Sequence, residues 1–227
     1  MTKPPNYEAE FEELKKRASE ARADGLSSDE EKELNATLSE IDASFERLRG
    51  AQEKMENEFF ALVGKAISLW AHLESLLIGM ASLLLRARPE KVGAVLYSIQ
   101  NFHVWLNIID ELFSIDKQLR QFSGDWPDIS SKLRSLNDIR VRLAHNTFFH
   151  DQSVPGMPTL KPGRFDTRSK SMKSQPVGWE QVIEFIEKIN SVTPPLLSLN
   201  KLLLAQLRAL HGKPSPRPVD PPGEGAQ

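Results

Sequence analysis

Cysteine is absent from this sequence of 227 residues. Its absence excludes disulfide bonds, thiolate metal sites and cysteine nucleophiles, and it fits a reducing compartment, so we expect a cytoplasmic protein. An excess of positive charge is also lacking, because 29 Lys and Arg stand against 31 Asp and Glu. The chain as a whole therefore has no positive electrostatic field that would predict nucleic-acid binding. Any site for a polyanion must be local.

Several sequence signatures are missing as well. The N-terminal stretch MTKPPNYEAEFEELKK has no apolar core, so we expect no secretory signal there. Neither a glycine-rich phosphate loop nor a Gly-x-Ser-x-Gly motif occurs. His150 and Asp151 follow His145 closely, but their spacing matches no recognised ligand set. We therefore expect no metal site and no cofactor.

One apolar run raises the question of a membrane span. Residues 66–85 read AISLWAHLESLLIGMASLLL, about the length needed to cross a bilayer. His72 and Glu74 lie near its middle, and an acid at the centre of a bilayer costs roughly 2.5–3.5 kcal/mol on insertion scales. We expect no membrane span here, but a helix buried on all sides within a helical bundle.

Helical periodicity dominates the chain. A first amphipathic helix ends at Gly25, and the sequence SSDEE at 27–31 predicts the N-cap and capping box of the next helix. An apolar stripe then allows one very long helix, with Gly50 as the favoured place for a bend. The first members of this stripe are Leu34, Leu38, Ile41, Phe45, Leu48, Met55 and Phe59.

The density of charge divides the chain into regions. It is high up to about residue 56 and then falls, so we predict that residues 1–56 form a coiled-coil-like helical hairpin, called the arm below. Residues 57–212 are predicted to form an all-α, up-and-down bundle of four or five helices. Residues 213–227 are rich in proline and are predicted to be a disordered tail.

Proline and asparagine mark the later helices. Asn101 predicts a break after the helix that Pro89 opens, and Pro194 with Pro195 is expected to interrupt the last helix. Residues 147–177 lack helical periodicity and predict a long irregular loop, in which a short hairpin around 159–165 is one option.

The segment LNDIRVRLAHN at 136–146 gathers two arginines, a histidine and an asparagine at a predicted helix end. A structural explanation is available, because cations near a helix C-terminus contribute roughly 0.3–1 kcal/mol each, and Asn146 tolerates the left-handed conformation that often follows a helix. A functional explanation is available too. Arginine offers phosphate a planar donor fork, histidine exchanges protons near neutral pH, and metal-free RNA cleavage needs both.

The arrangement of these segments resembles the HEPN superfamily. The segment Trp70-Ala-His-Leu-Glu74 lies in a first apolar helix. A later helix ends with Arg140 and His145, which are separated by four residues. The family signature is an arginine, four to six intervening residues and a histidine. The resemblance covers about residues 57–210. It implies a helical domain that forms homodimers in which two copies of the motif line one cleft. Many members are metal-independent endoribonucleases of toxin, phage-defence or RNA-processing systems, and others are non-catalytic.

The resemblance also implies roles for individual residues. His145 would be the general acid and base, Arg140 would hold the scissile phosphate, and Glu74 would orient one of them. The alternative is that Glu74 is a partly exposed carboxylate at the rim of the core and pairs with some other basic residue. Val141 stands where active members commonly carry a polar residue, often Asn, so whether the chain is an enzyme stays open.

Geometry and charge add candidate substrate contacts. On a straight helix Arg140 and His145 stand about 140° apart, whereas Arg142 and His145 share a face. Either the helix end unwinds, a second subunit completes the site, or Arg142 binds the phosphate, and Asn146 would help to position substrate. A local basic excess between residues 152 and 179 adds Lys161, Arg164 and Arg168, although such residues are often merely solvated.

Two functions remain in view. The first is a HEPN-like RNA-binding protein, an endoribonuclease if it is an enzyme, with a composite Arg/His site at a homodimer interface. The second is a catalytically inactive helical interaction protein that binds a partner through residues 1–56.

Overall fold

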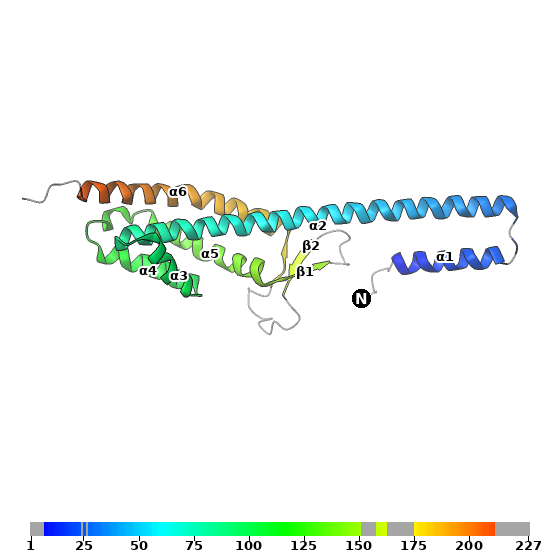
Figure 1. The fold of residues 1–227 in the computed structure, drawn as a ribbon, viewed down its shortest axis with the longest axis horizontal. Coiled ribbons are helices and arrows are strands. Elements are labelled where there is room, and N and C mark those ends of the chain that lie inside the picture. The colour runs from blue at the N-terminus through cyan, green and yellow to red at the C-terminus, as the bar shows by residue number, and fades with distance from the viewer. Residues whose placement is uncertain (1–6, 24, 26, 151–157, 163–174, 212–227) are drawn as a thin grey trace, which may run out of the picture. The chain divides into compact units, whose positions relative to one another are not determined.

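The computed structural model describes residues 7–23, 25, 27–150, 158–162 and 175–211, and their fold is predominantly helical, as the sequence predicts (Figure 1). The elements are α1 (Tyr7–Ala23), α2 (Ser28–Leu85), α3 (Pro89–Ser98), α4 (Phe102–Ile115), the 3-10 helix η1 (Arg120–Phe122), α5 (Trp126–His145), β1 (Thr147–His150), β2 (Pro158–Lys161), β3 (Val177–Gly178) and α6 (Trp179–His211).

The chain divides into two compact units, and each is described by itself. The first unit contains residues 1–65 and 142–183, and the second contains residues 66–141 and 184–227. The chain therefore passes from one unit to the other within α2, within α5 and within α6. The boundaries near 56 and 212 stay predictions, and the predicted tail lies outside the described residues.

In the first unit, α1 lies alongside the first half of α2 as a helical hairpin (Figure 1). The rings of Phe11 and Phe45 are 4.7 Å apart, and Lys15 Nζ lies 3.3 Å from Asp42 Oδ1. These contacts hold α1 against α2, while the extent predicted for the arm, residues 1–56, stays a prediction. Leu48 was expected to continue the apolar stripe, but it is 67% exposed.

The capping box predicted before α2 is also present. The Ser27 hydroxyl and backbone N–H donate to Glu30 Oε2 at 2.6 and 3.0 Å, and the Glu30 N–H donates to Ser27 Oγ at 3.4 Å. α2 then stays helical through Gly50 as far as Leu85. By length and composition alone, one stretch of α2 could cross a membrane, and 44% of that stretch is buried within the structure.

The strands of the first unit form an antiparallel sheet in the order β1-β2-β3. Phe148 is paired with Leu160, and Leu160 with Val177. Leu160 and Val177 are buried, while the Phe148 ring lies 4.8 Å from that of Phe60 on α2. The prediction of an irregular loop is therefore wrong for these strands. Strands of two to four residues are too short to show the alternation that would reveal them.

The second unit packs segments of five α-helices around an apolar core. The Trp70 ring of α2 lies 4.7 Å from that of Phe102 on α4 and 6.1 Å from that of Phe185 on α6. Asn101 caps α4 by accepting the N–H of His103 at 3.0 Å, which confirms the predicted break between α3 and α4. Further completely buried side chains include Leu73, Leu77, Met80, Leu106, Ile109, Leu133, Ile189 and Leu203.

The last helix differs from expectation. α6 continues through Pro194 and Pro195, so the predicted interruption is wrong. Both prolines are exposed, while Val192 and Leu196 on either side of them are completely buried. Packing of this apolar face against the core offsets the backbone hydrogen bonds that the two prolines cannot donate.

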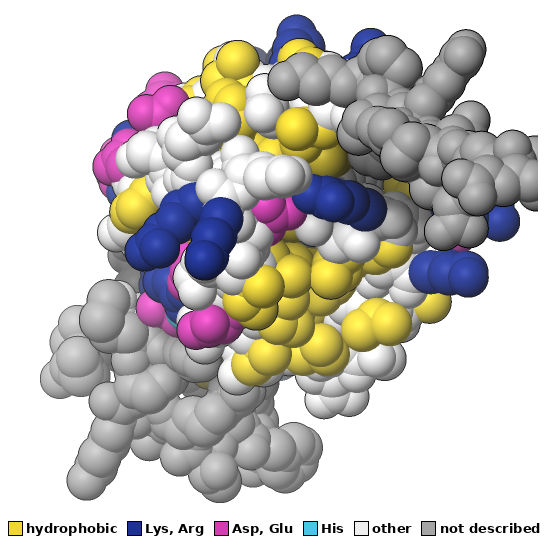
Figure 2. Space-filling view, turned by 90° about the vertical axis from the view of Figure 1, so that its left-hand side faces the viewer, with side chains coloured by type: hydrophobic (Ala, Val, Ile, Leu, Met, Phe, Trp, Pro, Cys, Tyr) yellow, Lys and Arg dark blue, Asp and Glu magenta, His cyan; other side chains and the backbone are white. Residues whose placement is uncertain are grey.

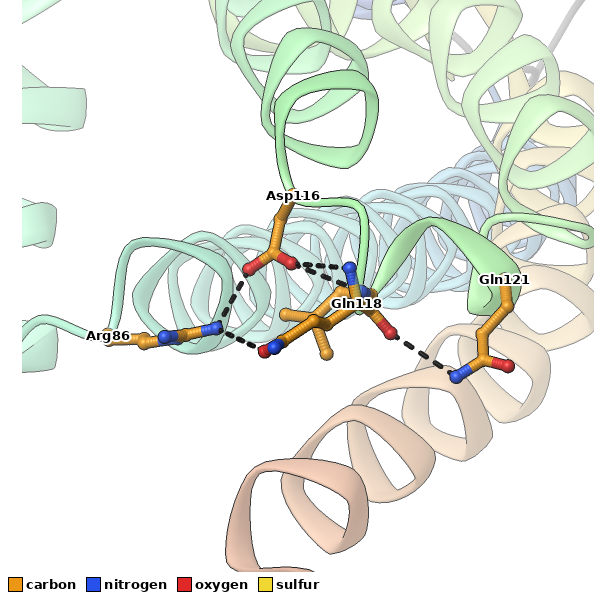
Figure 3. A network of polar contacts seen from close by, with 5 residues as sticks. Arg86, Asp116, Gln118 and Gln121 are labelled. Carbon is orange, nitrogen blue, oxygen red and sulfur yellow. Dashed lines mark hydrogen bonds and ion pairs between the residues drawn. The ribbon is translucent and has the colours of Figure 1, made fainter. Parts of the chain in front are cut away.

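A polar network closes the end of α2 (Figure 3). Arg86 has φ 51°, the one positive φ of a non-glycine residue within the described ranges. Its Nη2 donates to Asp116 Oδ2 and to Gln118 Oε1, both at 3.2 Å. The carboxylate of Asp116 also accepts the backbone N–H of Gln118 at 2.9 Å. These bonds join the end of α2 to the connection between α4 and α5.

Figure 2 shows a patch of apolar side chains on one face, with Lys, Arg, Asp and Glu side chains beside it. Two large apolar side chains of the second unit are also well exposed. Leu85 and Ile115, at the ends of α2 and α4, are 48% and 73% exposed. The chain neighbours of both residues, Arg86 and Asp116, belong to the polar network.

Candidate functional site

Glu74 lies at the edge of the core of the second unit. Its Oε1 accepts a hydrogen bond from the indole N–H of Trp70 at 2.7 Å, one turn earlier on α2. Trp70 is 2% exposed and the Glu74 side chain 15%, so a nearly buried acid is held by a core residue. Burial of a carboxylate without a partner is costly, and the indole removes part of that cost.

Arg140 supplies the charge opposite Glu74. It lies on the part of α5 that belongs to the second unit, and its Nη2 is 3.7 Å from Glu74 Oε1. At this distance the two groups form an ion pair, but they are too far apart for a strong hydrogen bond. The side chain of Arg140 stays 35% exposed, so the guanidinium is held on one side and open to solvent on the other. Glu74 therefore lies beside Arg140, one residue of the 136–146 segment.

The end of α5 belongs to the first unit and carries Arg142 and His145. Arg142 is only 9% exposed, and its Nε has no hydrogen-bond partner among the residues that the structure describes. His145, the last residue of α5, is exposed. The two side chains thus differ: the guanidinium is enclosed, and the imidazole faces solvent, where it can exchange protons.

Asn146 has a structural task. Its Nδ2 donates to the carbonyl oxygen of Leu160 on β2 at 3.4 Å and to that of Gln175 at 3.3 Å. The amide therefore ties the end of α5 to the sheet. The left-handed conformation considered for Asn146 is wrong, because within the described ranges only Arg86 among non-glycine residues has a positive φ. The tether to the sheet replaces that helix ending.

The basic residues after the motif lie only partly within the described chain. Lys161 is the last residue of β2, is half-buried and is paired in register with Thr147. Arg164 and Arg168 fall outside the described residues. Among the described residues, no group of three or more His, Asp or Glu side chains is arranged to hold a metal ion.

Sequence reasoning missed the role of Trp70. In the sequence it stands only in the apolar run 66–85 and in the segment that resembles the family, whereas in the structure it is buried and its indole N–H also fixes the Glu74 carboxylate. The signal was available, because tryptophan followed by glutamate four residues later on a helix brings the two side chains together.

A comparison with protein-family models finds no matching family, and comparisons with curated proteins and with solved structures find no match either.

Proposed function

We propose that this chain is an RNA-binding protein of the HEPN type that cleaves RNA without a metal ion and acts as a cytoplasmic homodimer. The observation that carries the proposal is the ion pair between Glu74 and Arg140. These residues come from the two sequence segments that resemble the family, one in α2 and one in α5, and they lie 3.7 Å apart.

The proposed chemistry assigns one task to each group. Arg140 stabilises the charge that develops on the scissile phosphate, and Glu74 keeps its guanidinium in place. His145 takes the proton of the ribose 2′-hydroxyl and returns a proton to the leaving oxygen. An exposed imidazole at the end of α5 suits a group that must meet a large substrate.

Purified protein incubated with total RNA in low salt with a chelator tests the catalytic proposal. We expect the wild type to cleave RNA and His145→Ala to lose at least about 100-fold in rate, the usual contribution of a general acid or base. His72→Ala changes an exposed histidine of α2 and should cleave as the wild type does. Equal, negligible cleavage by the wild type and His145→Ala would exclude the nuclease.

The dimer is tested separately by light scattering after gel filtration. The chain has a mass of 25.6 kDa, so the proposal requires a species of about twice that mass. A monomer at all accessible concentrations would contradict the composite site.

A second candidate is a non-catalytic interaction protein, and the arm favours it. Residues 1–56 carry nine Lys and Arg against fifteen Asp and Glu, a charge that repels RNA. The arm also exposes two large apolar side chains, since Leu14 is 49% and Leu48 67% exposed. Val141 in place of a polar residue points the same way.

Paired variants distinguish the two candidates. In a pull-down, the interaction protein predicts that Leu14→Glu with Leu48→Glu abolishes complex formation and that His145→Ala leaves it intact. The nuclease predicts that His145→Ala abolishes cleavage of RNA and that Leu14→Glu with Leu48→Glu leaves cleavage intact. Retention of the same partners by the arm variant would exclude the second candidate.

A further inference from the structure

Arg142 differs from the other arginines of α5, which form ion pairs through Nη2, in having a buried Nε without a hydrogen-bond partner among the described residues. Arg134 Nη2 lies 3.0 Å from Asp110 Oδ2, and Arg140 pairs with Glu74. Arg142 is more enclosed than either, at 9% exposure, yet its Nε makes no hydrogen bond to any residue that the structure describes.

The described chain that follows Arg142, as far as Trp179, is poor in acid. The described residues from Arg142 to Trp179, in the ranges 142–150, 158–162 and 175–179, include no Asp or Glu. They do include Lys161, which directly follows the Leu160 carbonyl that anchors Asn146.

The backbone at Arg142 is also fixed. Its carbonyl accepts the N–H of Asn146 at 2.9 Å, and the Asn146 amide is bonded to β2 and to Gln175. Leu143, the next residue, is buried. The backbone that carries Arg142 is therefore held by the attachment of α5 to the sheet.

A buried Nε without a hydrogen-bond partner adds to the desolvation cost of the guanidinium, and arginine cannot avoid that cost by losing its proton. We propose that Arg142 is the binding site for one phosphate group of the RNA backbone, whose oxygens satisfy Nε and the adjacent terminal nitrogen together. This inference rests on the proposed RNA-binding function. His145 lies three residues further on the same helix, so the bound phosphate would lie beside the imidazole.

Fluorescence anisotropy with a labelled oligouridine tests this site, with 2′-O-methyl riboses to prevent cleavage. Arg142→Gln leaves a shorter polar side chain that can still donate hydrogen bonds, but it removes the charge. We expect about tenfold weaker binding. Between roughly 50 and 200 mM KCl, the slope of the logarithm of the binding constant against the logarithm of the salt concentration should become shallower by about 0.7, the value for one phosphate contact on a single strand. Arg134→Gln, which removes an ion-paired arginine of the same helix, should leave the salt dependence unchanged.

Thermal unfolding separates a ligand site from a structural residue. Removal of an unpaired enclosed charge should leave the melting temperature of Arg142→Gln equal to or above that of the wild type. Arg142→Lys keeps the charge but not the fork, so it should retain the wild-type salt dependence while binding more weakly.

Each contrary outcome has a separate meaning. If the wild type binds the oligouridine and Arg142→Gln keeps its salt dependence, the Arg142 site is wrong while RNA binding stands. Loss of folding or of the dimer in Arg142→Gln would assign the residue to structure or to a subunit contact and also overturn the inference. Failure of the wild type to bind would remove the proposed function itself.

Discussion

The indole N–H of Trp70 donates a hydrogen bond of 2.7 Å to the Glu74 carboxylate, which joins a core ring to the acid that faces Arg140. The ring is 2% exposed and packs between Phe102 and Phe185. The packing of the second unit thus determines where this carboxylate lies, and through it where the Arg140 guanidinium is held.

Replacement of Trp70 by Phe should lower the free energy of unfolding more than the same change at Trp105. Hydrogen bonds to charged groups contribute about 1.5–3 kcal/mol and neutral ones about 0.5–1.5 kcal/mol. Trp105 is equally enclosed but donates to the neutral carbonyl of Ile99 at 3.0 Å. Urea unfolding of both variants measures the difference, and equal losses would show that the bond to Glu74 adds nothing beyond ring volume.

Asn146→Ala should destabilise the first unit by about 1–2 kcal/mol, because two backbone carbonyls lose their donor. Amide hydrogen exchange should show faster exchange in β2 and β3. The control is Asn107→Ala, which removes an exposed amide that accepts from Arg134. Unchanged exchange in the sheet would mean that α5 is attached to it by other contacts.

Pro194→Ala should stabilise the protein by about 1–3 kcal/mol, since alanine restores a backbone donor within a helix and is its best former. Pro127, the second residue of α5, occupies a first turn where proline lacks no hydrogen bond, so Pro127→Ala should change stability by less than about 0.5 kcal/mol. Thermal or urea unfolding compares the two. Similar effects at both positions would contradict this account of α6.

At Arg86, glycine should be better tolerated than alanine. Both changes remove the partly exposed ion pair with Asp116, which contributes little. Only glycine adopts φ 51° without strain, so Arg86→Gly should exceed Arg86→Ala by about 1 kcal/mol in stability. Inside α2, at exposed Ala71, glycine should instead be the worse of the two residues. The same order at both sites would be inconsistent with the left-handed helix ending.

The capping box predicts a pH effect. Hydrogen bonds from the Ser27 hydroxyl and backbone N–H lower the pKa of the Glu30 carboxyl below its ordinary value of 4.5. Because the folded pKa is the lower one, the stabilisation is complete above the unfolded pKa and is lost as the pH falls through the folded pKa. An NMR titration of Glu30 should show a midpoint below 4.5 that rises in Ser27→Ala but not in Ser44→Ala. A wild-type midpoint at or above 4.5 would refute it.

Local sequence signals predicted several of these features because each depends on neighbouring residues alone. The Ser27–Glu30 box, the break at Asn101 and the helix end before Gly25 need only backbone chemistry within a few positions. The cluster at 140–146 was likewise recognisable from residue types and spacing, and Glu74 from its place beside the apolar stripe.

Long-range packing decided the rest. The sequence by itself determined a predominantly helical protein, with its helix starts, its acidic arm and its basic motif, because periodicity and capping are local properties. Only the tertiary structure decided that α6 runs through Pro194 and that three short strands follow α5 in the described chain. It also decided that Arg142 is enclosed while His145 is exposed, and that Glu74 faces Arg140. In each case burial against residues distant in sequence outweighs local preference, and no local pattern records which distant residues will meet.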